Sequence, residues 1–468
     1  MLHLSYFIAR YFNHFTMKNS IFSLLILVCT NAITAQNYPK ILSERDRADV
    51  INATLADRFD NLLPQLMRRE GIDMWILISR EYNEDPVMRT MLPAEWLSAR
   101  RRTIMVFSLK KSPNTEGGTF SKDTLEKLAI ARYDVGLLKA SWNLNVFPDQ
   151  WEALAEVIKE RNPEKIGLNI SPNYAHADGL SHFEYQSFQE KLPESIKKRL
   201  VSAEKLAVAW LETRTEREMI LYENIARVSH QIVREGLSDR VIQAGVTTTD
   251  DVVWWYRQRI RELGLDTWFH PTVDVQRFDT TRFDHLRTFS KRPNQEVIQP
   301  GDLLHVDFGI TYLRLNTDMQ EHAYVLKAGE TTVPDYLQKA FKQANRLQDI
   351  LTENFKSGLS GNKILQNALE QAKKEGIMGS IYTHPIGFHG HAAGPTIGMW
   401  DNQKSIAGAG DYPLFGNTAY SIELNASVSI PEWSGKIIRI MLEQDGFFNG
   451  KTFRYIDGRQ EAIYPIQR

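Results

Sequence analysis

Four acidic residues stand in apolar, strand-like runs of the C-terminal part of the chain, and they constrain its fold more than any other feature. Asp307 lies inside the first apolar run of GDLLHVDFGITYLRLNTDMQEHAYVL (Gly301–Leu326), and Asp318 opens the second. The segment predicts two strands joined by a turn. A carboxylate buried alone is costly, and two carboxylates that a hairpin brings together repel each other unless a cation lies between them. For this pair alone, one surface aspartate and one turn aspartate remain an equally good interpretation.

Two glutamates further along the chain favour a common acidic site. Glu423 lies in AYSIELN (Ala419–Asn425) and Glu443 lies in IIRIMLEQDGFF (Ile437–Phe448). Both runs are rich in residues that favour strands, so we expect each glutamate to lie in a strand. A single glutamate of this kind is often the partner of a buried arginine. Two of them, added to two aspartates, indicate one site.

A glycine-rich segment, THPIGFHGHAAGP (Thr383–Pro395), adds the histidines His384, His389 and His391. Small residues let the backbone approach an ion or a substrate closely, although an exposed loop with incidental histidines is the alternative. Four carboxylates and a histidine favour Mn, Zn or Co, or Fe, over Cu(I) or an iron–sulfur cluster. Four acidic ligands exceed the charge of one divalent ion, so two bridged ions fit better. Such a pair, about 3.5–4 Å apart, can activate a bridging water and polarise a carbonyl.

Residues 1–36 have the pattern of a secretory signal. The apolar run IFSLLILV (Ile21–Val28) follows a basic residue and precedes small and polar residues, as in signal peptides, and it is shorter than the ~20 residues of a membrane span. Met17 fits the biological start, and we expect cleavage after residue 35 or 36; an uncleaved anchor is the alternative. Cleavage would remove Cys29, the only cysteine, which suits an oxidising compartment. The expected location is therefore the periplasm or the medium.

The rest of the chain predicts two domains, 37–212 and 213–468. In the first, the strand-like runs MWILIS (74–79), TIMVFSL (103–109) and KIGLNIS (165–171) alternate with helical ones such as 149–161, which indicates an α/β domain. In the second, helices are expected from residue 214, at 246–264 and around 336–355 and 362–375, followed by strands. Lys and Arg number 56 against 57 Asp and Glu, so no positive field would attract nucleic acid.

These residues, in this order, resemble the pita-bread metallopeptidases, and in particular the branch of Xaa-Pro aminopeptidases and prolidases. As in that family, ten residues separate Asp307 from Asp318, and GD-x4-D-F-G surrounds Asp307. The segment AYSIELN resembles the family's IEP/IEL strand, and Met441–Asp445 resembles its R-I-E-D-D strand. The resemblance runs from about Arg214 to the C-terminus. It implies an α+β chain in which a creatinase-like α/β domain, matched more weakly, precedes a pita-bread catalytic domain.

The resemblance also implies a metal ligand set. Asp307 would be the bidentate ligand of one ion, Asp318 and Glu443 would bridge both ions, and His391 and Glu423 would complete the shell of the other. We choose His391 because GHAAG resembles the family's GHGIG, and His389 is the competing ligand.

Catalytic roles are implied for the remaining histidines. His384 would contact the substrate or relay a proton, and His285 in FDHLRTF would line the pocket, although it lies further from Asp307 than is usual. The family has a further histidine where this chain has Trp400. If that histidine transfers a proton, its loss would cost roughly 10²–10⁴-fold, unless His389 substitutes. Three tryptophans belong either to a pocket or to the core: Trp254, Trp255 and Trp268.

The expected protein is thus an exported, dinuclear metallopeptidase that hydrolyses the bond between an N-terminal residue and proline. The resemblance implies two divalent metal ions, manganese foremost with zinc or cobalt as alternatives. It also implies a proline-containing peptide as substrate and allows a homodimer; neither nucleic acid nor a stable membrane span is expected. The alternatives are a metal-dependent amidohydrolase of a non-peptide substrate on the same fold, and a binding homologue without turnover.

Overall fold

The computed structural model describes residues 38–110, 124–278 and 296–467. The predicted signal, residues 1–36, and His285 lie outside these ranges. The described residues from Ile41 onward form one compact unit, and the predicted boundary at 212/213 within it stays a prediction. None of the described helices is both long and apolar enough to cross a membrane.

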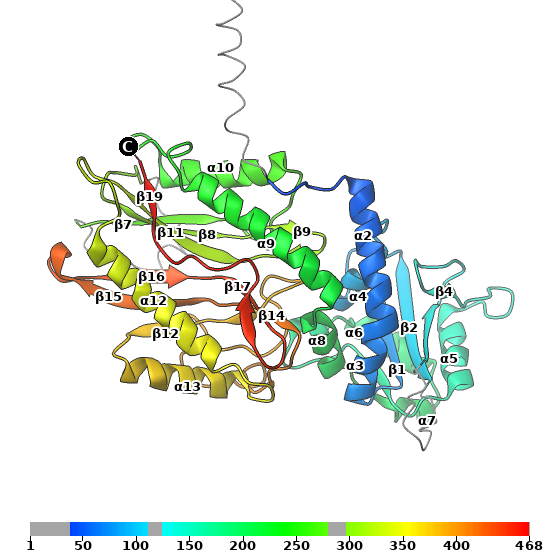
Figure 1. The fold of residues 1–468 in the computed structure, drawn as a ribbon. Coiled ribbons are helices and arrows are strands. Elements are labelled where there is room, and N and C mark those ends of the chain that lie inside the picture. Colours follow the sequence, from blue (N-terminus) through cyan, green and yellow to red (C-terminus); the bar gives the residue numbers. More distant parts are fainter. Residues whose placement is uncertain (1–37, 111–123, 279–295, 468) are drawn as a thin grey trace, which may run out of the picture. The chain divides into compact units, whose positions relative to one another are not determined.

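A six-stranded mixed sheet organises the first part of this unit (Figure 1). In spatial order its strands are β4 (Lys139–Ala140), β3 (Thr124–Ala129), β2 (Arg102–Lys110), β1 (Met74–Arg80), β5 (Ile166–Leu168) and β6 (Leu200–Ser202). The strands predicted at 74–79 and 103–109 are confirmed, and they pair antiparallel. The third is shorter than predicted. The chain leaves the sheet at Asn169, whose side chain bonds Trp75 and Asp85 instead.

Helices cover both faces of this sheet because successive residues of a strand point to opposite sides. Trp75 and Leu77 of β1 face one cluster of buried residues, and Met74 and Ile76 face another. The first cluster packs against α2 (Glu44–Asp57), the π-helical turn η1 (Arg58–Leu62), α3 (Leu63–Glu70), α4 (Pro86–Met91), η2 (Ala175–Ala177) and α8 (Glu204–Glu212). The second packs against α5 (Gln150–Arg161), α6 (His182–Glu190) and α7 (Glu194–Lys197). The predicted α/β arrangement is therefore confirmed.

A four-stranded sheet begins the second part, with the order β19-β11-β8-β7. Its strands are β7 (Thr272–Gln276), β8 (Leu303–Phe308), β11 (Met319–Val325) and β19 (Tyr464–Ile466). The helices α9 (Glu216–Gly236) and α10 (Thr249–Glu262) lie along it, as Figure 1 shows. Both begin with a capping box, in which a threonine and an acidic residue satisfy each other's backbone N–H. The predicted turn between β8 and β11 is itself a hairpin of β9 (Thr311–Tyr312) and β10 (Leu315–Asn316).

Two smaller sheets complete the fold. One contains β12 (Gly379–Ile381), β15 (Leu424–Ile430) and β16 (Lys436–Leu442); the other contains β13 (His384–Pro385), β14 (Thr418–Ser421), β17 (Asp445–Phe448) and β18 (Phe453–Tyr455). The helix α12 (Asp335–Glu353) packs on β15 and β16, and α13 (Gly361–Lys374) packs beside it. A short 3₁₀ turn, η3 (Pro431–Trp433), joins β15 to β16.

The prediction that Glu423 and Glu443 lie inside strands is wrong in detail. Glu423 lies in the break between β14 and β15, and Glu443 lies in the break between β16 and β17. At each break the chain passes from one small sheet to the other. Glu443 also forms an isolated β-bridge with Gln320 of β11. A carboxylate inside a continuous apolar strand would be costly to bury, whereas a break directs it to the place where three sheets meet.

A buried ion cluster joins α9 to the elements before it. The carboxylate of Glu218 accepts hydrogen bonds from Arg58 at 2.7 Å and from Arg214 at 3.0 Å. Both guanidinium groups also lie over the ring of Phe388, 4.9 and 4.6 Å from its centroid. Because Phe388 belongs to the histidine-rich segment, this cluster ties the path of that segment to the start of α9.

Candidate metal centre

The β8–β11 pair brings the two predicted aspartates together. Asp307 lies near the end of β8 and Asp318 immediately precedes β11, in a register that pairs Phe308 with Met319. The bridge between Gln320 and Glu443 adds a third carboxylate. Ligand atoms of Asp307, Asp318 and Glu443 all lie within 4.8 Å of one another. Residues far apart in the sequence therefore form one acidic centre.

His384 faces this centre from β13. Its Nε2 lies 3.5 Å from Oε1 of Glu443 and 3.8 Å from Oδ2 of Asp318. Its Nδ1 lies 2.9 Å from the carbonyl oxygen of Pro385, which can only accept, so Nδ1 carries the proton. A histidine that ligates a metal commonly donates its other N–H to such a carbonyl. Ligand atoms of His384, Glu423 and Glu443 also lie within 4.8 Å of one another.

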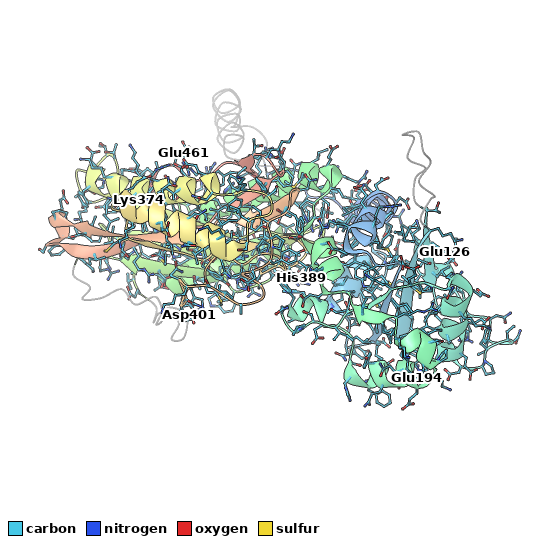
Figure 2. All side chains as sticks on the ribbon, turned by 90° about the horizontal axis from the view of Figure 1, so that it is seen from below. Glu126, Glu194, Lys374, His389, Asp401 and Glu461 are labelled. Carbon is cyan, nitrogen blue, oxygen red and sulfur yellow. The ribbon has the colours of Figure 1, made fainter. Side chains whose placement is uncertain are left out.

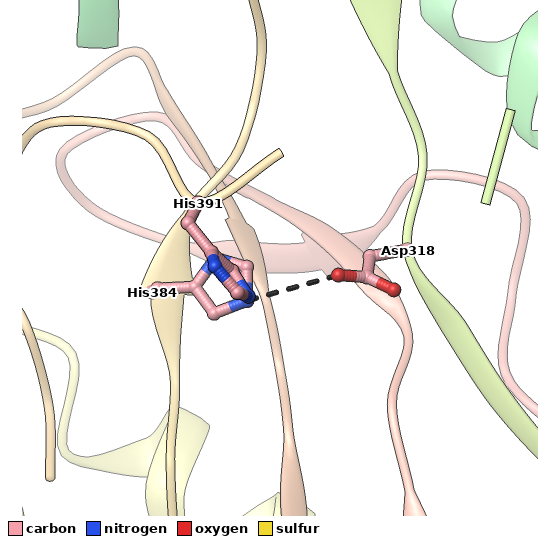
Figure 3. Close-up of side chains that lie close together, drawn as sticks. All are labelled: Asp318, His384 and His391. Carbon is pink, nitrogen blue, oxygen red and sulfur yellow. Dashed lines mark ion pairs between the residues drawn. The ribbon is translucent and has the colours of Figure 1, made fainter. Parts of the chain in front are cut away.

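His391 approaches the same aspartate from the side. Figure 3 shows His384 and His391 close together, with the carboxylate of Asp318 beside them. Ligand atoms of these three residues lie within 4.8 Å of one another, and the two imidazole centroids are 4.8 Å apart. The ring of His391 also meets Trp268 at 5.2 Å and Tyr382 at 5.9 Å. The aromatic rings of Trp268 and Tyr382 therefore lie next to the acidic centre, around His391.

The other predicted residues lie elsewhere. The ring of His389, labelled in Figure 2, is 4.6 Å from the ring of His176, and among the described residues His389 belongs to none of the three ligand groupings. Trp254 and Trp400 are 57% and 47% exposed, so neither is a core residue. Trp255 is half-buried, and Trp268 alone of the three predicted tryptophans contacts a histidine of the centre.

The carboxylates of the centre disturb one another electrostatically. Burial, followed by the charge of Glu443, raises the pKa of Asp307, Asp318 and Glu423 well above their usual range. Burial acts in the same direction on Glu443, but His384, Ser421 and Gln320 outweigh it and hold the pKa of Glu443 below its usual value. The neighbouring protein groups therefore do not fully offset the mutual repulsion of these four carboxylates.

Divalent metal ions fit this donor set. Among the described residues, Oδ1 of Asp307, Oδ1 of Asp318 and Nε2 of His384 are buried without a hydrogen-bond partner. Buried polar atoms normally have partners, and all three are of the kinds that ligate divalent ions. Metal ions held by these atoms would satisfy them and offset the repulsion between the carboxylates.

The part of the chain that contains this centre matches a known protein family. Residues 221–443 match the family model of metallopeptidase family M24. This segment belongs to metallopeptidase family M24. The chain is accordingly a metal-dependent hydrolase, and the matched residues include the four predicted carboxylates and both histidines of the centre. None of the curated proteins searched matches the chain.

Solved structures share the fold of this chain. X-Pro aminopeptidase from Thermotoga maritima MSB8 is 16% identical, with a TM-score of 0.57 over 86% of this chain and 99% of that one. Xaa-Pro dipeptidase from Bacillus anthracis is 15% identical, with a TM-score of 0.54 over 90% and 100%. A putative aminopeptidase P from Bacillus anthracis is 12% identical, with a TM-score of 0.55 over 86% and 94%. The expected architecture, a pita-bread domain preceded by an α/β region, is confirmed.

Sequence reasoning missed three residues of this M24 centre: Gln320, Ser421 and Asp445. Oγ of Ser421 donates to Oε1 of Glu443 at 2.6 Å, and Oδ1 of Asp445 accepts from the backbone N–H of Asp318 at 3.3 Å. Each of the three lies two residues from a predicted ligand. Because side chains in extended backbone point to the same side with a period of two, this spacing is the signal that could have found them.

Proposed function

We propose that this M24 hydrolase is a dinuclear aminopeptidase or dipeptidase that cleaves the bond between an N-terminal residue and proline. The observation that carries the proposal is the convergence of four carboxylates and a histidine on one centre within the M24 segment. The names of the solved structures with this fold, an X-Pro aminopeptidase and an Xaa-Pro dipeptidase, support the substrate class.

We assign the histidine ligand to His384, in place of His391. His384 is buried, its Nδ1 proton is held by a backbone carbonyl, and its Nε2 faces two carboxylates. His391 is exposed and lies beside His384. The remaining ligands would be Asp307, Asp318, Glu423 and Glu443, as the resemblance implies. Manganese, cobalt and zinc all suit this oxygen-rich set.

Bound metal ions and individual side chains of the chain would have different roles in hydrolysis. A bound divalent pair would supply Lewis acidity and lower the pKa of water. The imidazole of His391, next to Asp318, is placed to take a proton during the attack of water on the carbonyl carbon. It would return that proton to the proline nitrogen when the C–N bond breaks. Trp268 and Tyr382 flank this imidazole and offer apolar contact to a prolyl ring.

Peptide turnover by the mature chain tests the proposal. We expect chelation to abolish cleavage of Xaa-Pro peptides, and added Mn, Co or Zn to restore it, while matched Xaa-Ala peptides stay intact. Metal at 100 times its dissociation constant should also stabilise the fold by about 2.7 kcal/mol, measured by thermal unfolding. Cleavage of other amides, with proline peptides intact, would favour the amidohydrolase. Stabilisation without turnover of any amide would favour a binding homologue.

We also propose that the chain is exported to the periplasm or the medium. The support is the apolar run at 21–28 with its basic and small-residue flanks. Expression of the full chain in a bacterial host should give an envelope or medium fraction whose mass places the N-terminus at residue 36 or 37. A variant with arginines at Leu24 and Leu25 is the control and should stay inside the cell. Recovery of the unchanged chain with its intact N-terminus from the cytosol would contradict export.

A further inference from the structure

Gln320 of β11 contacts two of the four carboxylates with one side-chain group. Its Nε2 donates to Oε1 of Glu423 at 2.9 Å and to Oε2 of Glu443 at 2.7 Å. A primary amide carries two hydrogens on this nitrogen, so the two bonds use both. Gln320 is only 6% exposed, which leaves little water to replace either bond.

His305 of β8 determines the orientation of this amide. Nε2 of His305 lies 3.0 Å from Oε1 of Gln320. An amide oxygen can only accept, so His305 donates from Nε2. With the amide rotated by half a turn, its oxygen would face the two carboxylates and its NH₂ group would face the His305 N–H. The orientation in the structure therefore matches donors to acceptors at all three contacts, with the NH₂ group toward the two carboxylates and the oxygen toward His305.

Asp274 lies on the neighbouring strand, β7, and faces the other ring nitrogen of His305. The β7–β8 register pairs Asp274 with His305, and Oδ2 of Asp274 lies 3.6 Å from Nδ1 of the imidazole. Both residues are buried. A carboxylate, an imidazole and an amide thus follow one another across three adjacent strands and end at the metal centre.

We propose that Gln320, oriented by His305, is a positioning residue of the metal centre. By holding one oxygen each of Glu423 and Glu443, it determines which lone pairs these carboxylates present to metal ions. It also keeps the two acidic groups in place against their mutual repulsion. This inference rests on the proposed metal centre, since it concerns how the carboxylates of that centre are held.

A variant without the amide separates positioning from packing. In Gln320→Met the side chain keeps its length but loses both donors. We expect affinity for Mn or Co, measured by calorimetry, to fall 10–100-fold, the usual effect of removing an outer partner of metal ligands. The absorption spectrum of the Co-loaded protein should change as well. Gln276→Met is the matched control, because Gln276 is a buried glutamine on β7 whose amide bonds the backbone of Arg439; its affinity and spectrum should match the wild type.

Variants of His305 test the orientation separately. His305→Gln keeps an N–H donor near the position of Nε2 and should retain metal affinity within about threefold, whereas His305→Phe should lose nearly as much as Gln320→Met. Because the two residues act in series, His305→Phe combined with Gln320→Met should be no worse than Gln320→Met alone. If Gln320→Met does not fold, the difference between the two His305 variants decides.

Two results would overturn the inference. One is unchanged affinity and an unchanged Co spectrum in Gln320→Met or His305→Phe while the wild type binds metal. The other is an additive loss in the double variant. Failure of the wild type itself to bind any divalent metal would overturn the proposed centre together with this inference, so the two failures are distinguishable.

Discussion

Replacing Asp318 with asparagine is expected to remove metal binding and peptide hydrolysis together. Asp318 belongs to two of the three ligand groupings and lies 3.8 Å from Nε2 of His384. Asparagine has nearly the same size but carries no charge. Loss of an outer partner typically costs 10–100-fold in affinity, so loss of a central ligand should cost more than about 100-fold. Calorimetric titration with Mn or Co and turnover of an Xaa-Pro peptide measure the two effects.

The fold should survive this change. Asparagine removes one of several carboxylates that repel one another, so the metal-free variant should unfold at a temperature no lower than that of the metal-free wild type. Asp335→Asn, at an exposed position at the start of α12, is the control and should leave both metal affinity and turnover unchanged. Normal turnover by Asp318→Asn would refute the assignment of Asp318 as a ligand.

Alanine variants of the two neighbouring histidines should fail in different ways. His384→Ala should lose metal affinity, because its buried Nε2 faces Glu443 and Asp318. His391→Ala should keep its metal ions and lose about 10²–10⁴-fold in kcat, the usual contribution of a proton-transfer group. Metal titration and kcat, measured on both variants, separate these outcomes.

The third histidine supplies the control for this pair. His389 packs against His176 and lies in none of the ligand groupings of the described residues, so His389→Ala should bind metal as the wild type does. Loss of metal by His391→Ala, with metal retained by His384→Ala, would contradict the assignment of His384 and would identify His391 as the ligand, as the family resemblance implies.

The carboxylates of the centre could be found in the sequence because the free-energy cost of burying each one is evident from its neighbours along the chain. An acidic residue amid strand-forming residues needs a partner wherever the chain folds, and Asp307, Asp318, Glu423 and Glu443 all violate the apolar pattern around them. Their order and spacing then matched a known family. The strand breaks at both glutamates could not be predicted, because they depend on which sheet each strand joins.

The histidines show the limit of such reasoning. His384, His389 and His391 share one short glycine-rich segment, where a pattern of residue types does not determine which way a ring points. Pairing of β13 with β14, and the packing of Phe388 on two buried arginines, determine the path of this segment. Both contacts join residues that are distant in the sequence.

The amino-acid sequence alone determined the acidic composition of the site, the class of metal it suits and the α/β elements around it, since these follow from local chemistry and periodicity. Only the tertiary structure brought His384 and His391 to the acidic centre, and only it placed Gln320 and His305 in contact with it or with each other. Those assignments depend on strand register and on contacts across three sheets, and such long-range pairing is set by the packing of the whole unit.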